Sequence, residues 1–233
     1  MNANADTIVT EPLQFEAQRL EMVAAQLRGR GIRSESVLAA MSRIPRHEFI
    51  SAGQAAAAYT DHALPIADGQ TISQPYVVAA MTEALALSGA ERVLDIGSGS
   101  GYQAAVLSTL AREVIAVEWV SHLADSSRER LGRLGFTNIR LEQGDGSLGW
   151  PVAAPYGAIL VAAAAPEIPP PLLDQLAEGG RLVIPVGTLE EQNLICVTKR
   201  AGQLTTKILF ACRFIPLLGR YGWPGGQQGH SAA

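Results

Sequence analysis

Cysteine is scarce in this chain of 233 residues. Cys196 and Cys212 are its only two, and both lie inside apolar runs typical of β-strands. A disulfide framework is therefore not supported, and we expect two buried free thiols. The four histidines are scattered without the spacing of metal ligands, so we assign no metal.

Excess basic charge and long apolar runs are also lacking. The formal net charge is −4, and no basic stretch of the kind that binds nucleic acid stands out. No apolar run approaches the roughly 18 residues of a membrane span. The first twelve residues lack the basic and apolar regions of a signal peptide. These absences favour a cytoplasmic protein that binds neither nucleic acid nor membrane.

From residue 91 onward, short apolar strands alternate with helices. Strands are predicted at 92–97, 113–120, 157–165 and 181–187, and a strand with its loop at 138–146. A loop and helix are predicted at 98–111, and helices at 122–135 and 172–180. This alternation is typical of parallel βαβ units. Two more strands, at 194–200 and 206–217, follow without a helix between them, which predicts an antiparallel hairpin at the sheet edge. The fold class is therefore a three-layer α/β sandwich with a mainly parallel, seven-stranded sheet.

The first 90 residues are predicted to be largely helical. A helix at 15–31 places Leu20, Val23, Ala24 and Leu27 on one face, and further helices follow at 34–44, capped by Ser34 or Ser36, and at 75–87. We expect one domain at 13–221, with a helical cap and active-site loop at 13–90 and a Rossmann-like core at 91–221. Residues 1–12 and 222–233 are expected to be flexible ends.

The sequence VLDIGSGSGY is the strongest local motif. Gly97, Gly99 and Gly101 let a strand turn tightly into a helix and let the backbone approach a ligand closely. Glu118, at the end of the next strand, suits the two hydroxyls of a ribose. A dinucleotide and S-adenosylmethionine both fit this motif. Asp95 within the first strand, the acidic loop Gly144-Asp145-Gly146 and the terminal hairpin favour S-adenosylmethionine.

The segment DGQTISQP, residues 68–75, precedes the glycine motif and contains Ser73. From the residues alone, Ser73 is a preferred N-cap for the helix that begins near Pro75. A hydroxyl beside the glycine loop could also contact substrate, and the sequence pattern leaves both roles open.

These motifs together resemble the protein-L-isoaspartate O-methyltransferase family, from about Leu20 to Leu217. The similarity lies in PRHEFI, AYTDHALPI, DGQTISQP, VLDIGSGSGYQAAVLS, GDGSLGW, AAAPEIPPPLLDQLAEGGRLVIPVG and RFIPL. It implies methyl transfer from S-adenosyl-L-methionine to the α-carboxylate of L-isoaspartyl residues, which leaves S-adenosyl-L-homocysteine and begins repair through a succinimide. Isoaspartyl proteins and peptides are the implied partners, and a monomer is expected.

The resemblance also implies roles for individual residues. Ser73 would be the active-site residue, holding the substrate carboxylate or the closing loop. The cofactor would be bound by Gln70, Thr71, Ile72, Asp95, Gly97, Ser98, Gly99, Ser100, Gly101, Glu118, Asp145 and Gly146. The peptide would meet Leu64, Pro65, Ile66 and Arg213.

The chain departs from the family pattern at Gly157, where an Asp is usual, and at Leu218, where a polar residue is common. Other hypotheses are a relative that methylates aspartate in one dedicated peptide, a non-catalytic cofactor-binding protein, and a small-molecule or RNA methyltransferase. The lack of an added recruiting region and the presence of DGQTISQP favour the repair enzyme.

Overall fold

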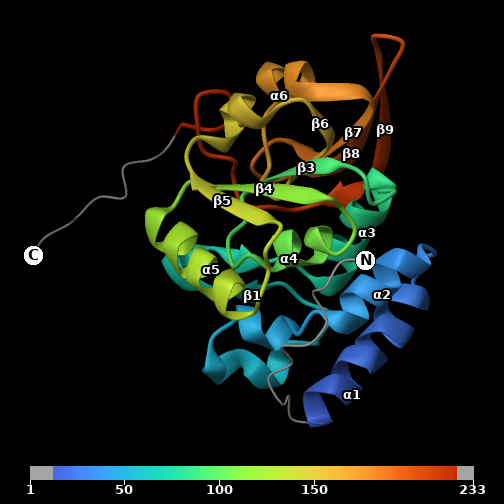
Figure 1. Cartoon of the computed structure of the whole chain (residues 1–233), viewed down its shortest axis with the longest axis vertical. Coiled ribbons are helices and arrows are strands. Elements are labelled where there is room, and N and C mark those ends of the chain that lie inside the picture. The colour runs from blue at the N-terminus through green and yellow to red at the C-terminus, as the bar shows by residue number, and fades with distance from the viewer. Residues whose placement is uncertain (1–12, 225–233) are drawn as a thin grey trace, which may run out of the picture.

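The computed structural model describes residues 13–224, and its centre is a seven-stranded sheet in the order β5-β4-β3-β6-β7-β8-β9 (Figure 1). The five parallel strands are β3 (Arg92–Ile96), β4 (Glu113–Glu118), β5 (Ile139–Gln143), β6 (Tyr156–Val161) and β7 (Leu176–Gly187). They are followed by β8 (Gln192–Arg200) and β9 (Gln203–Cys212), each antiparallel to the strand before it. The predicted mainly parallel sheet with a terminal hairpin is confirmed.

Helices cover both faces of this sheet and complete the three layers. One face packs against α3 (Pro75–Leu85), α4 (Tyr102–Ser108) and α5 (Ser121–Arg133). The other face is covered by α6 (Pro170–Gln175) and two 3-10 turns, η5 (Gly146–Leu148) and η6 (Pro151–Ala153). Because side chains of a strand alternate between faces, neighbouring residues of β3 enter different cores: Val93 packs toward α3–α5 and Leu94 toward α6.

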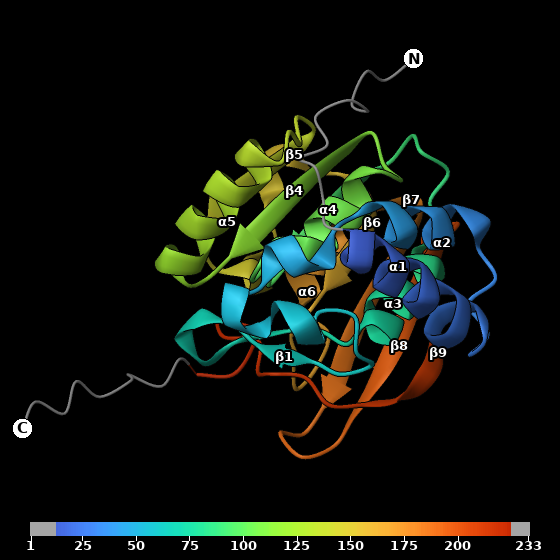
Figure 2. The same ribbon diagram turned by 90° about the horizontal axis from the view of Figure 1, so that it is seen from below.

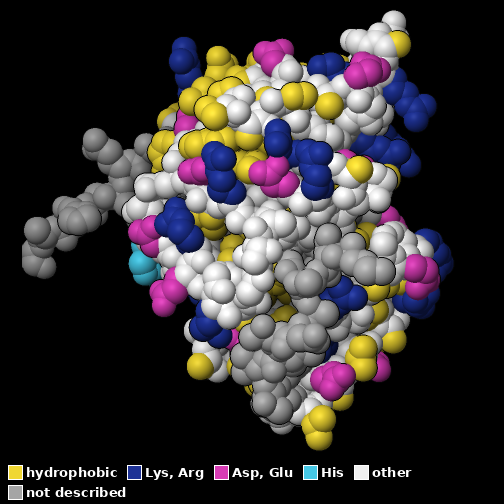
Figure 3. Space-filling model, viewed as in Figure 1, with side chains coloured by type: hydrophobic (Ala, Val, Ile, Leu, Met, Phe, Trp, Pro, Cys, Tyr) yellow, Lys and Arg dark blue, Asp and Glu magenta, His cyan; other side chains and the backbone are white. Residues whose placement is uncertain are grey.

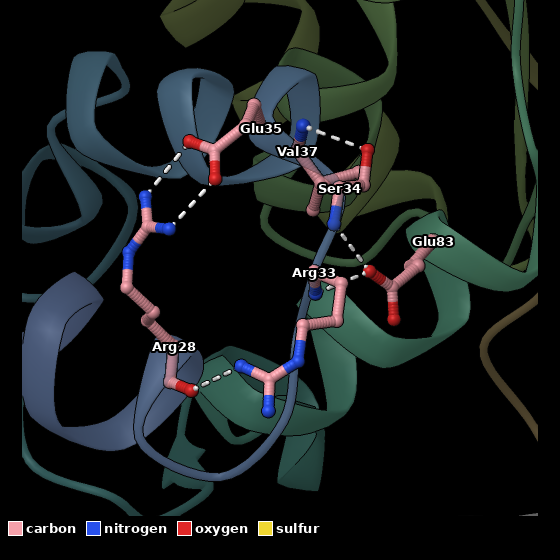
Figure 4. Close-up of polar contacts among 6 residues, drawn as sticks. All are labelled: Arg28, Arg33, Ser34, Glu35, Val37 and Glu83. Atoms are coloured by element: carbon pink, nitrogen blue, oxygen red, sulfur yellow. Dashed lines mark hydrogen bonds and ion pairs between the residues drawn. The ribbon is translucent and has the colours of Figure 1, made fainter.

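The N-terminal helices form a cap beside α3 (Figures 1 and 2). They are α1 (Leu13–Glu21), the π-helix η1 (Met22–Arg28) and α2 (Glu35–Arg43). Glu83 of α3 accepts hydrogen bonds from the amides of Arg33 (2.7 Å) and Ser34 (2.6 Å), which fixes the start of α2 (Figure 4). Ser34, one of the two predicted caps, accepts from the Val37 amide.

The predicted apolar face of the first helix is partly wrong. Val23 and Leu27 are buried, but Leu20 and Ala24 are exposed. The buried face is displaced by one position from the predicted one, because Met22 packs into the core and the Arg19 guanidinium donates to the Ser42 carbonyl of α2. Arg19 and Met22 take the inward positions instead.

Three other predicted boundaries are wrong. The strand expected at 157–165 ends at Val161. The helix expected at 172–180 ends at Gln175, because Leu176 already pairs with Tyr156 as the start of β7. A register shift between Tyr156 and Ala158 accommodates the extra residues. The last strand ends at Cys212, before RFIPL. Short 3-10 and strand segments form the connection before α3: η2 (Arg46–Phe49), η3 (Ala52–Ala57), β1 (Leu64–Pro65), η4 (Ala67–Gly69) and β2 (Thr71–Ile72).

Four further expectations concern the surface charge, membrane-spanning helices, the cysteines and the chain ends. Basic and acidic side chains are interspersed over the face drawn in Figure 3, and no helix within residues 13–224 is long and apolar enough to cross a membrane. Cys196 and Cys212 are free thiols, of which Cys196 is buried as expected and Cys212 is only partly buried. Trp223 donates to the carbonyls of Leu217 and Ala164. Of the segments expected to be flexible, residues 222–223 are held by backbone hydrogen bonds, whereas 1–12 and 225–233 lie outside the described residues.

Alanine substitutions at Gly146 and Gly132 should change the free energy of unfolding in opposite directions. A Cβ on Gly146 would collide with the buried side chain of Ile96, whereas one on Gly132, exposed in α5, would meet nothing. We expect Gly146→Ala to lower the free energy of unfolding by about 1–3 kcal/mol through overpacking. Gly132→Ala should raise it by up to about 1 kcal/mol through helix propensity. Urea denaturation measures both, and equal effects of the two substitutions would contradict this account.

Candidate active site

The turn after β3 has a backbone that only glycine adopts readily at three positions. Gly97, Gly99 and Gly101 have φ of 78°, 52° and 86°. These positive values explain the alternate glycines, since a side chain would be strained there. The turn delivers the chain into α4 at Tyr102. Its backbone therefore lies at the carboxyl end of the parallel strands, where open α/β sheets bind ligands.

Glu118 ties this turn to the end of the neighbouring strand. Its carboxylate accepts hydrogen bonds from the backbone amides of Gly99 (2.8 Å) and Val120 (2.9 Å), one on each oxygen. The side chain is buried yet lines a cavity. A carboxylate oxygen can accept more than one hydrogen bond, so both oxygens can still accept from the hydroxyls of a ribose.

Asp95 is the most unusual group of the site. It is fully buried in β3, and neither carboxylate oxygen has a hydrogen-bond partner. Burial, and after it the negative charge of Glu118, raises the pKa of Asp95 to about 8. The Ser98 hydroxyl, in the glycine turn, is also buried without a partner. Buried polar atoms normally have partners, so these two residues fit a site completed by a polar, positively charged ligand.

A first cavity, here called the cofactor cavity, opens between the glycine turn, the end of β4 and the segment before α3. It is lined by most of the residues that the sequence predicted for the cofactor: Gln70, Thr71, Ile72, Gly97, Ser98, Gly99, Ser100, Glu118 and Gly146, together with Ser73. Asp95, Gly101 and Asp145 do not line it. The lining residues that the sequence analysis missed are Val78, Ile96, Tyr102, Gln103, Val117, Trp119, Val120, Ala162, Ala163 and Ile215–Leu218.

Asp145 contacts the chain's C-terminal segment rather than the cavity. Its carboxylate accepts from the Ser147 amide (2.9 Å), the Ser147 hydroxyl (2.6 Å) and the Arg220 amide (2.8 Å). These contacts hold the segment that supplies Ile215–Leu218 to the cavity wall. The motif RFIPL marked this segment in the sequence, but its position beside β6 depends on long-range contacts.

Ser73 lies where the cofactor cavity meets a second one. The second cavity, here called the peptide groove, shares Thr71, Ser73, Ala162, Ile215 and Pro216 with the first. Its other lining residues are Arg30, Ala63, Gln74, Tyr76, Val77, Leu189, Phe210, Ala211, Cys212, Arg213 and Phe214.

The Ser73 hydroxyl itself has no hydrogen-bond partner in the part of the chain that the structure describes. The expectation that Ser73 caps α3 is wrong, because Gln74 occupies the N-cap position and Pro75 the first turn. Since Pro has no amide N–H and suits that turn, the helix does not need a serine cap.

The three apolar residues predicted for the peptide, Leu64, Pro65 and Ile66, line neither cavity. Leu64 and Pro65 form β1, which pairs with β2, and the Ile66 side chain lies beside Gly99. Arg213, in contrast, lies in the peptide groove.

A side-chain contact between Asp68 Oδ2 and His122 Nδ1 (2.9 Å) joins the loop before β2 to the start of α5.

A sequence model described as Protein-L-isoaspartate(D-aspartate) O-methyltransferase matches residues 18–222. The chain belongs to this family. A protein-L-isoaspartate O-methyltransferase of Methanoculleus marisnigri is 54% identical over 208 residues, 89% of this chain and 94% of that protein. The protein of the same name from Syntrophus aciditrophicus is 50% identical over 215 residues, 91% of this chain and 99% of that protein.

Solved structures of the protein-L-isoaspartate O-methyltransferase family have the same fold. One is 31% identical with a TM-score of 0.79, covering 87% of this chain and 67% of that one. Another, a Plasmodium falciparum protein described as a putative family member, is 28% identical with a TM-score of 0.73 and covers 86% and 98%. It was solved in complex with S-adenosyl-L-homocysteine. That ligand is the product of the cofactor that the sequence analysis favoured over a dinucleotide.

Asp95→Asn should separate stability from cofactor binding. The pKa of Asp95 is raised from 3.8 to about 8 in the folded state, so folding takes up a proton between these values. Stability of the cofactor-free protein is therefore lost as pH rises from about 4 to 8. The neutral Asn avoids that loss, and at pH 8 the variant should be more stable by about 2 kcal/mol or more. Asp95 does not line the cofactor cavity, so it acts on S-adenosyl-L-methionine through its charge beneath the glycine turn, and its loss should weaken binding by up to about tenfold.

Urea denaturation at pH 5 and pH 8 and calorimetric titration with the cofactor measure these two effects. Asp125→Asn, on the exposed face of α5, is the matched control and should change neither. A pH-independent stability difference between wild type and Asp95→Asn would contradict the raised pKa.

The Asp68–His122 contact should restrain the loop that carries Gln70–Ser73 into the cofactor cavity. Both side chains are partly exposed, so their removal should change the free energy of unfolding by less than about 1 kcal/mol. We expect Asp68→Asn, His122→Gln and the double variant each to weaken cofactor binding about twofold to fivefold. Equal losses in all three, measured as a double-mutant cycle, support the coupling. Additive losses would show that the two residues act separately.

Proposed function

We propose that this chain transfers a methyl group from S-adenosyl-L-methionine to the α-carboxylate of L-isoaspartyl residues in damaged proteins and peptides. The observation that carries this function is the junction of the two cavities at Ser73. A cofactor and a peptide bound in adjoining cavities can meet only where the cavities share residues. Thr71, Ser73 and Ala162 lie at this junction.

The residues of the cofactor cavity fit the chemistry of S-adenosyl-L-methionine. When bound, that molecule supplies a methyl group on a positively charged sulfonium and leaves as S-adenosyl-L-homocysteine. Glu118 would accept from the ribose hydroxyls, and the glycine turn with Ser98 would hold the methionine end. Asp95, unpartnered beneath the turn, would favour the positive charge.

The acceptor needs no general base. A carboxylate with an ordinary pKa near 4 is already ionised at neutral pH, so the chain's task is to align its oxygen and to exclude water. Ser73 would donate a hydrogen bond to one carboxylate oxygen and leave the other facing the cofactor cavity. Such positioning can contribute about 7–11 kcal/mol to lowering a reaction barrier. The following backbone amide nitrogen then attacks the methyl ester and releases methanol, which forms a succinimide that water can open to normal aspartate.

The remaining expectations belong to the same proposal. Isoaspartyl proteins are the partners, nucleic acid and membranes are not bound, and the protein acts as a cytoplasmic monomer. The repair function is favoured over methylation of one dedicated peptide because the peptide groove is open and mostly apolar, with few groups that would read a single sequence.

Methyl transfer to paired peptides that differ only in L-isoaspartate or L-aspartate tests this function. Wild type should methylate the isoaspartyl peptide alone. Ser73→Ala should lower kcat/KM by about 10–100-fold, because a hydrogen bond to a charged group contributes about 1.5–3 kcal/mol. Cofactor affinity should stay within about threefold of wild type.

Ser126→Ala provides the matched control, since Ser126 lies on α5 and lines neither cavity. It should leave kcat/KM unchanged. Transfer to neither peptide, despite tight cofactor binding, would refute the repair function. An unchanged rate in Ser73→Ala would remove Ser73 from the active site.

A further inference from the structure

The charges of the peptide groove are all of one sign. Among the described residues that line it, the two charged side chains are Arg30 and Arg213, and the rest are polar or apolar. The chain as a whole carries a net charge of −4. The positive charge of the groove therefore differs in sign from that of the whole chain, and it must come from the arginines that line the groove.

The guanidinium of Arg30 already has partners within the fold. Its guanidinium lies 3.8 Å from the centroid of the Tyr76 ring, and Nη1 pairs with Asp61 Oδ2 at 2.6 Å. Tyr76 in turn packs against Phe210, with ring centroids 6.1 Å apart. This cation–aromatic stack forms one wall of the groove, and the Asp61 carboxylate neutralises its charge.

Arg213 differs from Arg30 in its surroundings. It is exposed, and its guanidinium has no hydrogen-bond or ion-pair partner within residues 13–224. Glu190 follows the groove residue Leu189 but does not line the groove. The net positive charge of the groove is therefore the charge of Arg213.

The position of Arg213 sets what it can reach. It precedes Ile215 and Pro216, which lie at the junction with the cofactor cavity, but does not itself line that cavity. Because Arg213 lines the groove and not the shared junction, its guanidinium lies where residues that flank the damaged one would bind. The groove volume of about 690 Å³ is within the range that holds a drug-sized ligand, enough for flanking side chains.

We propose that Arg213 is a specificity residue that favours isoaspartyl segments carrying a second carboxylate, from Asp or Glu, within about two residues of the damaged site. This inference rests on the proposed function and adds to it the class of substrate sequence. An exposed guanidinium and carboxylate attract each other modestly and in a salt-dependent way. The preference should therefore appear in KM, with kcat unchanged, because the pair forms equally in the ground and transition states.

Peptides with one isoaspartyl residue and Glu, Gln or Lys placed two residues before or after it test the inference. Wild type should show a KM about threefold to tenfold lower for Glu than for Lys on at least one side. Arg213→Gln should abolish that difference, and Arg213→Glu should reverse it. Arg213→Lys should retain it, and 0.5 M salt should reduce it in wild type.

Arg200→Glu is the matched control. It makes the same charge change at the opposite end of the β8–β9 hairpin, where Arg200 pairs with Gln203 far from the groove. It should keep the wild-type preference, and thermal unfolding should show all variants to be folded.

Three results would overturn the inference. Equal KM values for Glu and Lys peptides in wild type would show that no charge is read. An unchanged preference in Arg213→Glu would place the selectivity elsewhere. An equal loss of rate for every peptide in the Arg213 variants would mean that Arg213 holds the acceptor carboxylate itself. If wild type methylates no isoaspartyl peptide, the proposed function fails and this inference fails with it.

Discussion

Parallel pairing of β3 between β4 and β6 is the constraint on which the site depends. Because these strands run in the same direction, their carboxyl ends meet at one edge of the sheet. The glycine turn after β3, the Glu118 carboxylate at the end of β4 and Ala162 after β6 are adjacent for that reason alone. The two hydrogen bonds of Glu118 then fix the turn against the neighbouring strand. No single loop of the chain could build this arrangement.

Much of this could be predicted from local sequence. The glycine spacing, the acid at the end of the next strand and the alternation of strands and helices each reflect rules that act within a few residues. Gly97, Gly99 and Gly101 have the positive φ that their spacing suggested. The final hairpin formed because two apolar runs stand too close for a helix between them.

The sequence-based predictions failed where distant contacts decide. Leu20 and Ala24 are exposed because contacts with α2 turn Arg19 and Met22 inward instead. Leu176 joins β7 because it pairs with Tyr156 of β6. Gln74 replaces Ser73 as the cap, which leaves the serine hydroxyl at the cavity junction. At Gly157, where the family pattern has Asp, the Glu91 side chain occupies the space that a side chain would need. None of these outcomes is visible within one motif.

The segment after β9 has a consequence for a shortened form of the chain. Ile215 and Leu217 exchange backbone hydrogen bonds with Ala164, the Phe214 amide donates to Gln192, and Asp145 holds the Arg220 amide. This segment walls the cofactor cavity, yet it follows every strand of the sheet in chain order. The strands therefore pair without this segment, whereas the cofactor cavity is complete only with it. A chain truncated after β9 would keep its glycine turn without a closed place for the ligand.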